Sequence, residues 1–424
     1  MELKEGYKQS EVGVIPEDWE ILPLRKISPR QSVGLVINPS TYFDEAGTVP
    51  MLVGSAVSEN YIDASSANRI TGENNEKLSA SRLNTGDLVT VRVGEPGVTA
   101  VVPPHLDKCN CASMMIVRKH TAFDSTWLCW MMNSRIGRQQ VEHVQYGTAQ
   151  KQFNISDAVD FIYPVPSKAE QEAIAEALSD ADALIESLEQ LIAKKRQIKQ
   201  GAKQELLTGQ KRLPGFSGDW EVKAFGEVFA FLSTATNSRS DLVEDGEAYY
   251  IHYGDIHTEF HSHLDFAEMK PPMIERSKCG NAAPINNGDW VMADASEDYD
   301  GVGKTIEITG LKEGQDAVAG LHTFLLREKS PTFVPGFKGH LGGLKALHEE
   351  YLRVATGMKV YGVSKAALVD LELPVPHPAE QVAIASILSD MDAEIAALET
   401  KLAKARQVKQ GMMQELLTGN IRLI

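Results

Sequence analysis

The feature that most constrains this chain of 424 residues is a long internal repeat. Residues 164–213 and residues 374–423 align without a gap at an offset of 210, and 32 of the 50 aligned positions are identical. Unrelated segments of this length would share only a few positions, so both copies are expected to form the same structure. Any fold of the chain therefore uses one element twice, each time after a different stretch of sequence.

Each copy of the repeat has the start and stop signals of one long helix. Ser167 and Glu170 have the spacing of an N-terminal capping box, and Pro378 of the second copy stands at the favoured first helical position. Both copies end at a residue that favours the left-handed conformation found past a helix, namely Gly209 and Gly419. These signals predict helices over 167–208 and 377–418, each roughly 60 Å long at about 1.5 Å per residue.

Between these signals the apolar residues recur at alternating steps of four and three, the pattern of a coiled-coil seam. The seam consists of Ile174, Leu178, Ala181, Ile185, Leu188 and Ile192 in the first copy, and of Ile384, Leu388, Met391, Ile395, Leu398 and Leu402 in the second. The apolar positions then shift in phase, which predicts a stutter that leads to Ile198 and Leu206, or to Val408, Met412 and Leu416. Two matching seams predict an antiparallel coiled coil; the alternative is that each helix packs on its own domain.

Two larger segments precede the helices, so the chain has the order module, helix, module, helix. The predicted division is an N-terminal segment 1–20, a first module 21–163, a first helix segment 164–213, a second module 214–373 and a second helix segment 374–424. The modules share three landmarks: Asp18-Trp19-Glu20 with Asp219-Trp220-Glu221, Gly86-Asp87-Leu88-Val89 with Gly288-Asp289-Trp290-Val291, and 147–156 with 356–364. Because the modules otherwise differ greatly, the helices are expected to do one job twice and the modules a variable job.

Within each module short β-type runs alternate with turn residues. These runs are 88–93, 98–102 and 114–117 in the first module, and 249–253 and 324–326 in the second. One helix, predicted over 127–144, breaks the pattern of the first module. The predicted fold class is α+β: two α+β modules separated by two long helices, which form an antiparallel coiled coil in a pseudo-two-fold arrangement.

No motif of catalysis or metal binding emerges from the sequence. Asn38-Pro39 lacks the second proline and the aromatic residue of an adenine methyltransferase, and 301–304 lacks the spacing of a phosphate-binding loop and favours a hairpin turn. Four histidines lie close in sequence without a clear ligand pattern: His252, His257, His261 and His263. The four cysteines complete no zinc motif and are expected to be inert thiols: Cys109, Cys111, Cys129 and Cys279. We therefore predict no catalytic residue and no metal site.

The helix segments carry a recognisable set of short motifs. Both copies contain Pro-Val-Pro, Ala-Glu-Gln, Leu-Ser-Asp, Lys-Gln-Gly and Gln-Glu-Leu-Leu-Thr-Gly, and the chain opens with Gly-Val-Ile-Pro-Glu-Asp-Trp at 13–19. Duplicated behind two divergent modules, these motifs resemble the specificity subunit of type I restriction–modification systems. The resemblance covers essentially the whole chain, and it is most specific in the helices and weakest in the second module.

This resemblance implies a non-catalytic, sequence-specific DNA-recognition subunit. Each module would be a target-recognition domain for one half of a split site in double-stranded DNA. The helices would fix the spacing of the half-sites and dock two methyltransferase subunits, which restriction (motor) subunits then join. S-adenosylmethionine, ATP and Mg²⁺ are expected on those partner subunits only. A polar N-terminus and the lack of a long apolar segment favour a cytoplasmic protein without membrane contact.

Two rival functions belong to different classes. The first is a coiled-coil scaffold or adaptor with no role at nucleic acid. The second is a methyltransferase or nuclease in its own right, against which the missing motifs argue. Copurification with a methyltransferase, together with sequence-specific duplex binding, would separate the specificity subunit from the scaffold. An assay of the pure chain with a labelled methyl donor would test the second rival.

The distribution of charge sets an expectation for DNA affinity. The chain has a net charge of −16, although residues 21–160 carry 13 basic and 13 acidic groups. Residues 221–372 carry 14 basic and 24 acidic groups, so the second module is expected to bind DNA weakly without its partners. Basic side chains of the first helix either face solvent or form a docking surface, namely Lys194, Lys195, Arg196 and Lys199.

Reading of DNA bases needs long polar side chains at the groove edges, and contacts to phosphates come from Lys, Ser, Thr and Tyr. The candidate DNA-binding residues are Arg69, Arg92, Tyr146, Thr148, Lys151 and Gln152 in the first module, and Tyr253, Lys304, Lys359 and Tyr361 in the second. The alternative for each is a solvated surface residue or a packed tyrosine.

Overall fold

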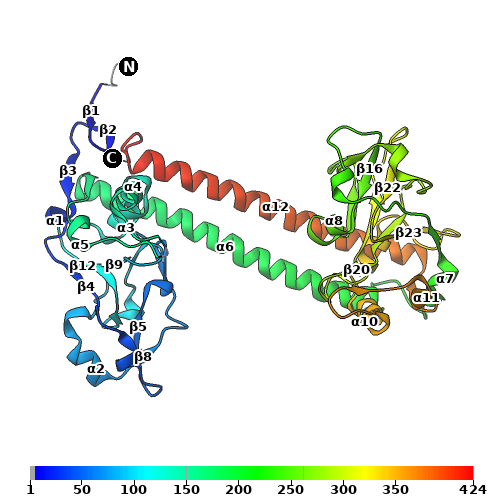
Figure 1. Cartoon of the computed structure of the whole chain (residues 1–424), viewed down its shortest axis with the longest axis horizontal. Coiled ribbons are helices and arrows are strands. Elements are labelled where there is room, and N and C mark those ends of the chain that lie inside the picture. Colours follow the sequence, from blue (N-terminus) through cyan, green and yellow to red (C-terminus); the bar gives the residue numbers. More distant parts are fainter. Residues whose placement is uncertain (1–4, 149, 261, 424) are drawn as a thin grey trace. The chain divides into compact units, whose positions relative to one another are not determined.

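A computed structural model describes residues 5–148, 150–260 and 262–423 of the chain. The chain divides into two compact units, Met1–Glu189 with Thr400–Ile424 (unit 1) and Gln190–Glu399 (unit 2). Each unit contains one module and part of both long helices (Figure 1). None of the helices in the described ranges is both long and apolar enough to cross a lipid bilayer.

The repeat segments form two long helices, as their start and stop signals predict. Helix α6 spans Lys168–Leu207 and helix α12 spans Pro378–Leu416. Gly209 and Gly419 follow them with φ angles of 70° and 71°, a conformation that glycine adopts without strain. Only half of the predicted capping box forms. The Ser167 hydroxyl accepts a hydrogen bond from the Glu170 amide (3.2 Å), whereas the Glu170 side chain binds Trp19 instead.

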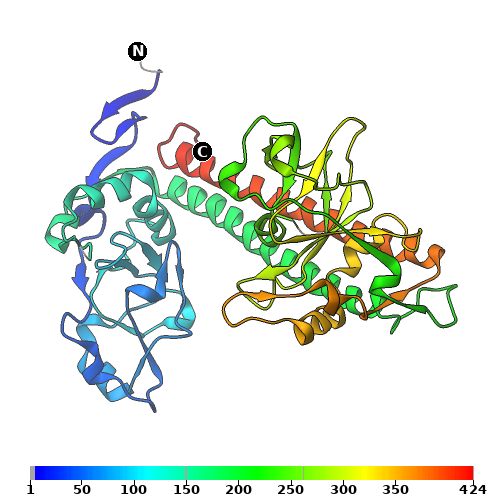
Figure 2. The same ribbon diagram turned by 45° about the vertical axis from the view of Figure 1, so that its right-hand side comes forward.

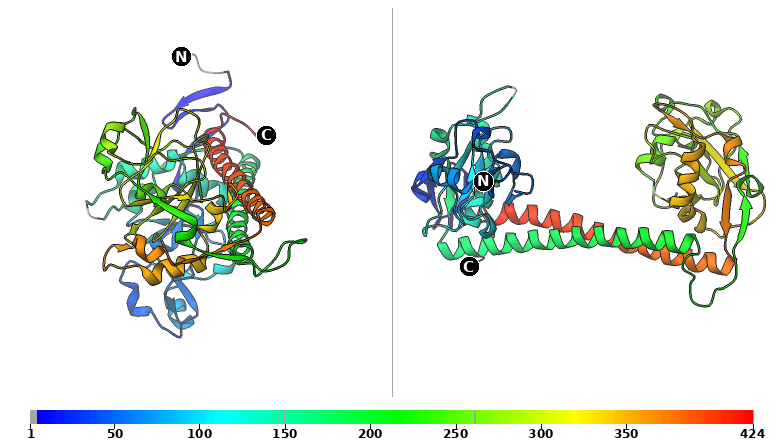
Figure 3. Two further views of the ribbon diagram at one scale, coloured as in Figure 1. Left: turned by 90° about the vertical axis from the view of Figure 1, so that its right-hand side faces the viewer. Right: turned by 90° about the horizontal axis from the view of Figure 1, so that it is seen from below.

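Within each unit the two helix segments run side by side in opposite directions (Figures 1 and 3). In unit 1, Arg406 pairs with Glu189 at 2.5 Å and Lys409 pairs with Asp182. The repeat-equivalent pairs in unit 2 are Arg196 with Glu399 at 2.5 Å and Lys199 with Asp392, and Lys195 adds a pair with Glu394 at 2.6 Å. The antiparallel coiled coil is thus confirmed within each unit. The sequence allowed four basic side chains either to face solvent or to form a docking surface. Three of them, Lys195, Arg196 and Lys199, bind acidic residues of the other helix.

The predicted stutter in the seam is wrong. Ile198 and Val408 are 48% and 52% exposed, although the apolar pattern placed them inside. Steps of four and three continue without interruption from Ile192 to Leu206 through three intervening positions, namely Lys195, Lys199 and Ala202. The lysine stems cover the seam while their ammonium groups reach acidic residues at its edge. A search for apolar residues alone does not detect seam positions that are occupied by lysine.

The first module contains two small sheets, with strand orders β10-β9-β12-β4 and β11-β5-β8. Their strands are β4 Gln31–Val33, β5 Val49–Leu52, β8 Arg69–Ile70, β9 Leu88–Val91, β10 Thr99–Val101, β11 Asn110–Cys111 and β12 Met114–Val117. A two-stranded hairpin, β6 Val57–Ser58 with β7 Tyr61–Ile62, lies outside both sheets. All three predicted runs of this module contain a strand, and two of the strands are shorter than predicted.

The second module repeats this plan despite its divergent sequence. Its sheets have the orders β15-β23-β19-β21-β17 and β18-β16-β22, in which β21, β19, β23 and β15 correspond to β10, β9, β12 and β4. The strands are β15 Phe229–Leu232, β16 Ala248–Ile251, β17 His263–Asp265, β18 Met273–Ile274, β19 Trp290–Ala293, β21 Thr305–Thr309, β22 Ala317–Ala319 and β23 Thr323–Glu328. Both predicted runs overlap strands, but Tyr253 begins helix α8 (Tyr253–Thr258).

Each module begins and ends on a pair of antiparallel strands. In unit 1, β3 (Glu20–Pro23) pairs with β13 (Ile162–Val165), and in unit 2, β14 (Glu221–Ala224) pairs with β25 (Glu372–Val375). The glutamate of each Asp-Trp-Glu landmark lies opposite the valine of a Pro-Val-Pro motif. These landmarks therefore mark the base of each module, directly before its long helix. A further hairpin, β1 (Tyr7–Ser10) with β2 (Gly13–Pro16), precedes the first module.

The single helix predicted over 127–144 is two helices, α3 (Ser125–Asn133) and α4 (Arg135–Val144). Ser134 between them is extended, with a ψ of 169°, so the helical path stops there. Gly137 permits the tight corner, because a Cβ atom at this position would lie 2.2 Å from the Met132 carbonyl oxygen. Figure 2 shows both helices between the strands of the first module and the start of α6. In unit 2, α9 (Phe337–Leu341) and α10 (Lys345–Val354) hold the corresponding places in the chain.

Several short helices complete the two modules. They are α1 Leu24–Ile27, α2 Gly72–Lys77, α5 Ile155–Ala158, α7 Phe225–Val228 and α11 Lys365–Leu368. In unit 1, module and helix share one core that includes Trp19, Trp127, Leu178 and Leu417. In unit 2 the shared core includes Leu207, Phe225, Trp290 and Leu388. The sequence offered two alternatives, packing of the long helices on each other and packing of each helix on its own module. Both kinds of packing occur together.

The Gly-Asp landmark ties neighbouring strands together in both modules. The Asp87 carboxylate accepts a hydrogen bond from Arg118 (2.8 Å), which follows β12. In the same way Arg327 of β23 donates two hydrogen bonds to Asp289 (2.8 and 2.6 Å). Both carboxylates are buried, so the paired arginine is needed to offset their desolvation. The landmark is thus structural and keeps the two scaffolds alike.

Candidate nucleic-acid interface

The third landmark forms the same tight loop in both modules. In the first module, Tyr146 and Gln152 exchange two backbone hydrogen bonds of 2.9 Å and close a loop over 147–151. In the second, Thr356 and Gly362 exchange bonds of 2.9 and 2.8 Å and close a loop over 357–361. We call these segments tip loop 1 and tip loop 2. Among the described residues, those of both loops are largely exposed.

Both tip loops begin with a glycine that no other residue can replace without strain. Gly147 has a φ of 97° and Gly357 has a φ of 132°. A Cβ atom would lie 2.3 Å from the Gln150 carbonyl oxygen in the first loop, and 1.9 Å from the Val360 carbonyl oxygen in the second. The positive φ and the close approach both demand glycine. The glycine shared by the two landmarks therefore sets the shape of each loop.

Each tip loop lies against the connection between two strands of the larger sheet. In the first module, the Gly94 amide donates to the Lys151 carbonyl oxygen (3.0 Å), and Val93 is bridged to Gln152. In the second, strand β20 (Ala295–Ser296) pairs with strand β24 (Tyr361–Gly362). The two connections run over 92–98 and 294–304, so the second is longer. The loop and the exposed part of its connection, 94–95 in the first module and 297–300 in the second, together form a small exposed surface in each module.

Five of the six candidates in the first module come together at this surface. Tyr146, Thr148, Lys151 and Gln152 belong to tip loop 1 or its ends, and Arg92 lies in the adjoining connection. The Arg92 Nε donates to the Phe153 carbonyl oxygen (3.3 Å), and the Tyr146 hydroxyl donates to Asn154 (2.9 Å). Thr148 and Lys151 are exposed, and Gln152 is half-buried. Their role in binding stays a prediction.

Arg69 is the candidate that lies apart from tip loop 1. It belongs to β8, an edge strand of the smaller sheet, and donates from Nη1 to the Thr48 carbonyl oxygen (3.0 Å). Phe43, Asp44 and Glu45 line the same pocket as Arg69, so this part of the surface also carries acidic residues. Within the described residues, no hydrogen bond or ion pair joins Arg69 to the other five candidates.

The four candidates of the second module gather around tip loop 2. Lys359 and Tyr361 lie in the loop, whereas Tyr253 contacts the ring of His257, with ring centroids 5.7 Å apart. His257 in turn hydrogen-bonds through Nε2 to the Ala295 carbonyl oxygen (3.0 Å), next to the loop. The Lys304 ammonium donates to the His257 carbonyl oxygen (3.0 Å), and burial lowers the pKa of Lys304. Of the four histidines singled out in the sequence, His261 lies outside the described residues.

Two residues near tip loop 2 were missed by the sequence analysis. Tyr299 stacks on Tyr361, with ring centroids 4.2 Å apart and planes inclined by 25°. Asp294 takes the place that Arg92 has in the first module. The Asp294 carbonyl oxygen accepts from the Val363 amide (2.9 Å), and the Arg92 carbonyl oxygen accepts from the Phe153 amide (3.3 Å), which is the equivalent position. Burial raises the pKa of Asp294, and His322, whose Nδ1 is 3.3 Å away, works against this shift. A gapped comparison of the two modules, anchored on the landmarks, could have exposed both positions.

A cluster of charged and aromatic side chains fixes each module to both long helices. In unit 1, the buried Glu170 of α6 accepts from Trp19 Nε1 (3.0 Å) and from Arg422 Nη2 (2.8 Å), and Arg422 also binds Asp18 (2.9 Å). We call this cluster clasp 1. Arg422 lies past the end of α12, so the clasp joins the module, the first turn of one helix and the segment after the other.

The same arrangement recurs in unit 2 as clasp 2. Glu380 of α12 accepts two hydrogen bonds from Arg212 (both 2.7 Å) and one from Trp220 Nε1 (2.9 Å). Burial alone would raise the pKa of Glu380, but the hydrogen bonds from Arg212 and Trp220 outweigh burial and hold this pKa below its ordinary value. The tryptophan of each Asp-Trp-Glu landmark therefore has a defined role, which the sequence did not reveal.

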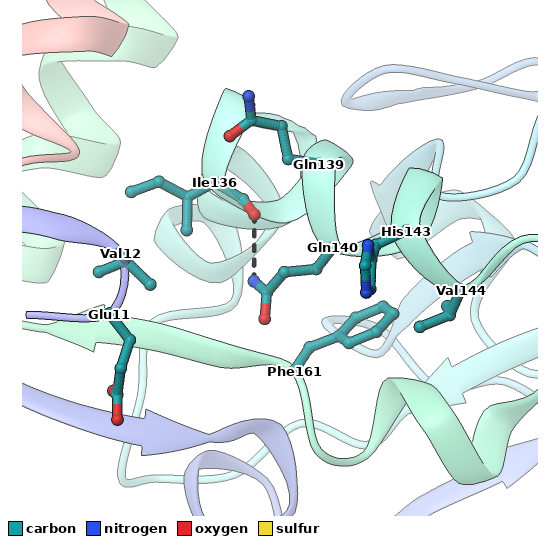
Figure 4. Close-up of a pocket in the computed structure, with 8 residues that line it drawn as sticks. All are labelled: Glu11, Val12, Ile136, Gln139, Gln140, His143, Val144 and Phe161. Atoms are coloured by element: carbon teal, nitrogen blue, oxygen red, sulfur yellow. Dashed lines mark hydrogen bonds between the residues drawn. The ribbon is translucent and has the colours of Figure 1, made fainter.

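A pocket in unit 1 lies beside α4 (Figure 4). It is lined by Glu11, Val12, Ile136, Gln139, Gln140, His143, Val144 and Phe161. Gln140 donates to the Ile136 carbonyl oxygen (3.0 Å), and Glu11 and His143 lie on different sides of the pocket. These two groups form no acid–base pair. Across the described ranges, no group of three or more His, Cys, Asp and Glu side chains could hold a metal ion.

Comparisons with known proteins agree with this architecture. No protein-family model matches the chain. Among curated proteins it is similar to two specificity subunits of Methanocaldococcus jannaschii, the putative type I restriction enzyme MjaX subunit and the MjaVIII subunit. The identities are 21% and 22% over 446 aligned residues, which cover 99% of this chain and 97% of each relative.

The fold is shared with solved structures of the same kind of protein. The S subunit of a type I restriction–modification system from M. genitalium aligns with a TM-score of 0.56 at 14% identity, over 98% of both chains. A chain from a structural study of complex assembly and conformational transition in a type I system aligns with a TM-score of 0.58 at 18% identity, over 96% of this chain and 99% of that one. In sequence and in fold, along its whole length, the chain is thus similar to specificity subunits of type I restriction–modification systems.

Proposed function

We propose that this chain is the non-catalytic DNA-recognition subunit of a type I restriction–modification complex. Each module reads one half of a split target in double-stranded DNA, and the surface that reads it is the tip loop with its adjoining connection. The observation that carries this proposal is the duplication itself. Two modules with one scaffold present the same loop with different side chains, each fixed by an equivalent clasp to nearly identical helices.

The long helices suit the role of a docking and spacing element. Their sequences are nearly the same in both copies, as expected of surfaces that meet two identical partners. We infer that these partners are two methyltransferase subunits, joined by restriction subunits in the complete complex. Methyl transfer, ATP hydrolysis and the Mg²⁺ that it requires belong to those partners, and the complex acts in the cytoplasm, where the DNA is.

The distribution of charge suggests that the chain and its partners supply different contacts to DNA. Residues 221–372 carry 14 basic and 24 acidic groups, so phosphate contacts at the second half-site must come largely from other subunits. We expect the assembled complex to bind its target with a steep dependence on salt, and the isolated chain to bind weakly.

The proposal is tested by sequencing the methylated bases of a host that carries the chain together with its methyltransferase. The expected result is one adenine-methylated motif split by a spacer of unspecified bases. Lys151→Ala should relax the first half of this motif and leave the second half intact. Lys77→Ala, in α2 of the same module, serves as the matched control, because Lys77 is exposed and pairs only with Glu73 (2.7 Å) in the described structure.

Two outcomes would contradict the proposal. One is a host in which the methyltransferase modifies DNA in the same way with and without this chain. The other is a split motif whose two halves stay unchanged in variants of both tip loops, which would place the reading surface elsewhere.

A further inference from the structure

The two tip loops have the same backbone plan but opposite chemistry. At the offset of 210, Met358 replaces Thr148, Val360 replaces Gln150 and Tyr361 replaces Lys151. The side chains of tip loop 1 at these positions are polar or charged, whereas those of tip loop 2 are apolar or aromatic. Met358 is 95% exposed and Val360 is 53% exposed, although both are side chains that proteins usually bury.

A second exposed ring extends this apolar surface. Tyr299, from the longer connection of the second module, is 57% exposed and stacks on Tyr361. The stack joins the connection to tip loop 2, so Met358, Val360, Tyr299 and Tyr361 form one apolar tip. Contiguous exposed apolar side chains at the end of a scaffold mark a contact surface more often than single ones do.

The charge around the apolar tip excludes phosphate attraction as its main source of affinity. Asp294 stands where the first module has Arg92, and three acidic residues belong to the same connection, namely Glu297, Asp298 and Asp300. Lys359, between Met358 and Val360, is the one cation within tip loop 2. A surface of this kind binds DNA only where it meets groups that lack negative charge.

We propose that the apolar tip reads the 5-methyl groups of thymine in the major groove of the second half-site. This inference rests on the proposed function, because it needs the second module to face DNA. The thymine methyl is the one apolar group that a base pair presents in the major groove, and apolar side chains are its usual partners. The two modules thus read by different means, module 1 through hydrogen bonds and module 2 through apolar contact.

The side chains of the tip suit this task. The unbranched side chain of Met358 adapts to the position of a methyl group at little cost in strain. The stacked pair of Tyr299 and Tyr361 holds the loop in place beside it. Because the tip carries a single cation, its discrimination should depend little on salt.

The test compares thymine with uracil, which differs only by this methyl group. The probe is a duplex with the motif that the wild-type complex methylates, in which each thymine is replaced in turn by deoxyuridine. Binding is measured with the assembled complex of the chain and its methyltransferase. At one or two thymines of the second half-site, the replacement should weaken binding about threefold to tenfold, as expected for the loss of one buried methyl contact. Replacements in the first half-site should leave binding unchanged.

A variant of the chain assigns the effect to the tip. Met358→Ala should weaken binding to the thymine duplex by a similar factor and bind thymine and uracil duplexes alike. Its folding is not at risk, since the side chain is almost fully exposed. Met269→Ala is the matched control, because Met269 is also exposed in the second module but follows the turn after β17. It should keep the wild-type preference for thymine.

Three outcomes would overturn the inference while the proposed function stands. In the first outcome, the second half-site contains no A·T pair. In the second, the complex binds duplexes with uracil as tightly as duplexes with thymine at every position of that half-site. In the third outcome, Met358→Ala weakens binding to both duplexes equally and keeps the preference for thymine, which would make the tip a contact for another subunit. A complex that binds no duplex sequence-specifically refutes the proposed function and this inference together.

Discussion

Arg422, six residues past the end of α12, binds the carboxylate of Glu170 in the first turn of α6. Arg212 and Glu380 repeat this relationship in unit 2. In both clasps the glutamate side chain is buried, so its negative charge depends on the arginine for compensation. The clasps explain why the repeat extends beyond the helices as far as the Arg-Leu pair at its end.

Arg422→Ala should destabilise unit 1 alone. The change leaves Glu170 buried without its cation, which costs about 1–3 kcal/mol after allowance for the partial exposure of Arg422. Hydrogen exchange measured by mass spectrometry follows the two units separately, and faster exchange is expected in peptides from residues 168–189. Arg212→Ala is the matched variant and should affect peptides of unit 2. Equal changes in both units would show that the clasps do not act locally.

Lys203→Met should stabilise unit 2 and change how its stability depends on pH. Burial, with a smaller contribution from Lys199, lowers the pKa of Lys203 to about 8. The folded state therefore binds fewer protons than the unfolded chain between pH 8 and 10.5, and stability rises with pH by at most about 1.4 kcal/mol per pH unit in this window. Methionine is the residue at the equivalent position 413, so the scaffold accommodates it. Chemical denaturation at pH 7.5, 8.5 and 9.5 should show a free energy of unfolding that rises with pH in the wild type and not in the variant. A rise that persists in the variant would mean that another group causes it.

His340→Gln should make unit 2 less sensitive to acid. Burial, followed by repulsion from His263, Lys203 and Lys199, lowers the pKa of His340 to about 3. Its contribution to stability is fully present above pH 6.5, and it is lost as the pH falls towards 3, because only the unfolded chain gains the proton. Denaturation curves between pH 7 and pH 4.5 measure this loss. His105→Gln, at an exposed position, is the control, and equal slopes in the two variants would speak against a role for His340.

Gly357→Ala should impair reading of the second half-site without unfolding the module. A Cβ atom 1.9 Å from the Val360 carbonyl oxygen forces tip loop 2 to change shape, whereas the strands beneath it are untouched. Methylation of the motif should lose specificity in its second half, and Gly147→Ala should do the same for the first half. Gly215→Ala, also at a positive φ but with open space around it, is the control. Loss of specificity in the control would mean that strain anywhere in unit 2 suffices.

The features that sequence predicted are those that depend on neighbours along the chain. Gly209 ends α6, Pro378 begins α12, and the seam from Ile174 to Ile192 follows from spacing alone. The stutter was wrong because Lys199 occupies a seam position through its aliphatic stem, and its partner Asp392 is distant in sequence. The break between α3 and α4 depends on close packing at Gly137, which a propensity pattern does not show.

The candidate interface was predictable in part for the same reason. Tip loops 1 and 2 were found because their glycines recur in a shared landmark. Tyr299 was missed because its stacking partner Tyr361 lies in another segment. Glu170 was assigned to a local capping box, whereas its true partners Trp19 and Arg422 lie far away in sequence. Contacts of this kind are fixed only when the chain folds.

The paired strands at the base of each module have a consequence for how such a chain diverges. Because β3 and β13 bring the chain in and out at one place, the segment between Pro23 and Ile162 can be exchanged without altering the clasp, provided that the new segment keeps the apolar residues that pack on the helix, such as Trp127. The same holds between Ala224 and Glu372. Replacement of one such segment would therefore change a tip loop and leave the clasp and the surface of the long helices as they are.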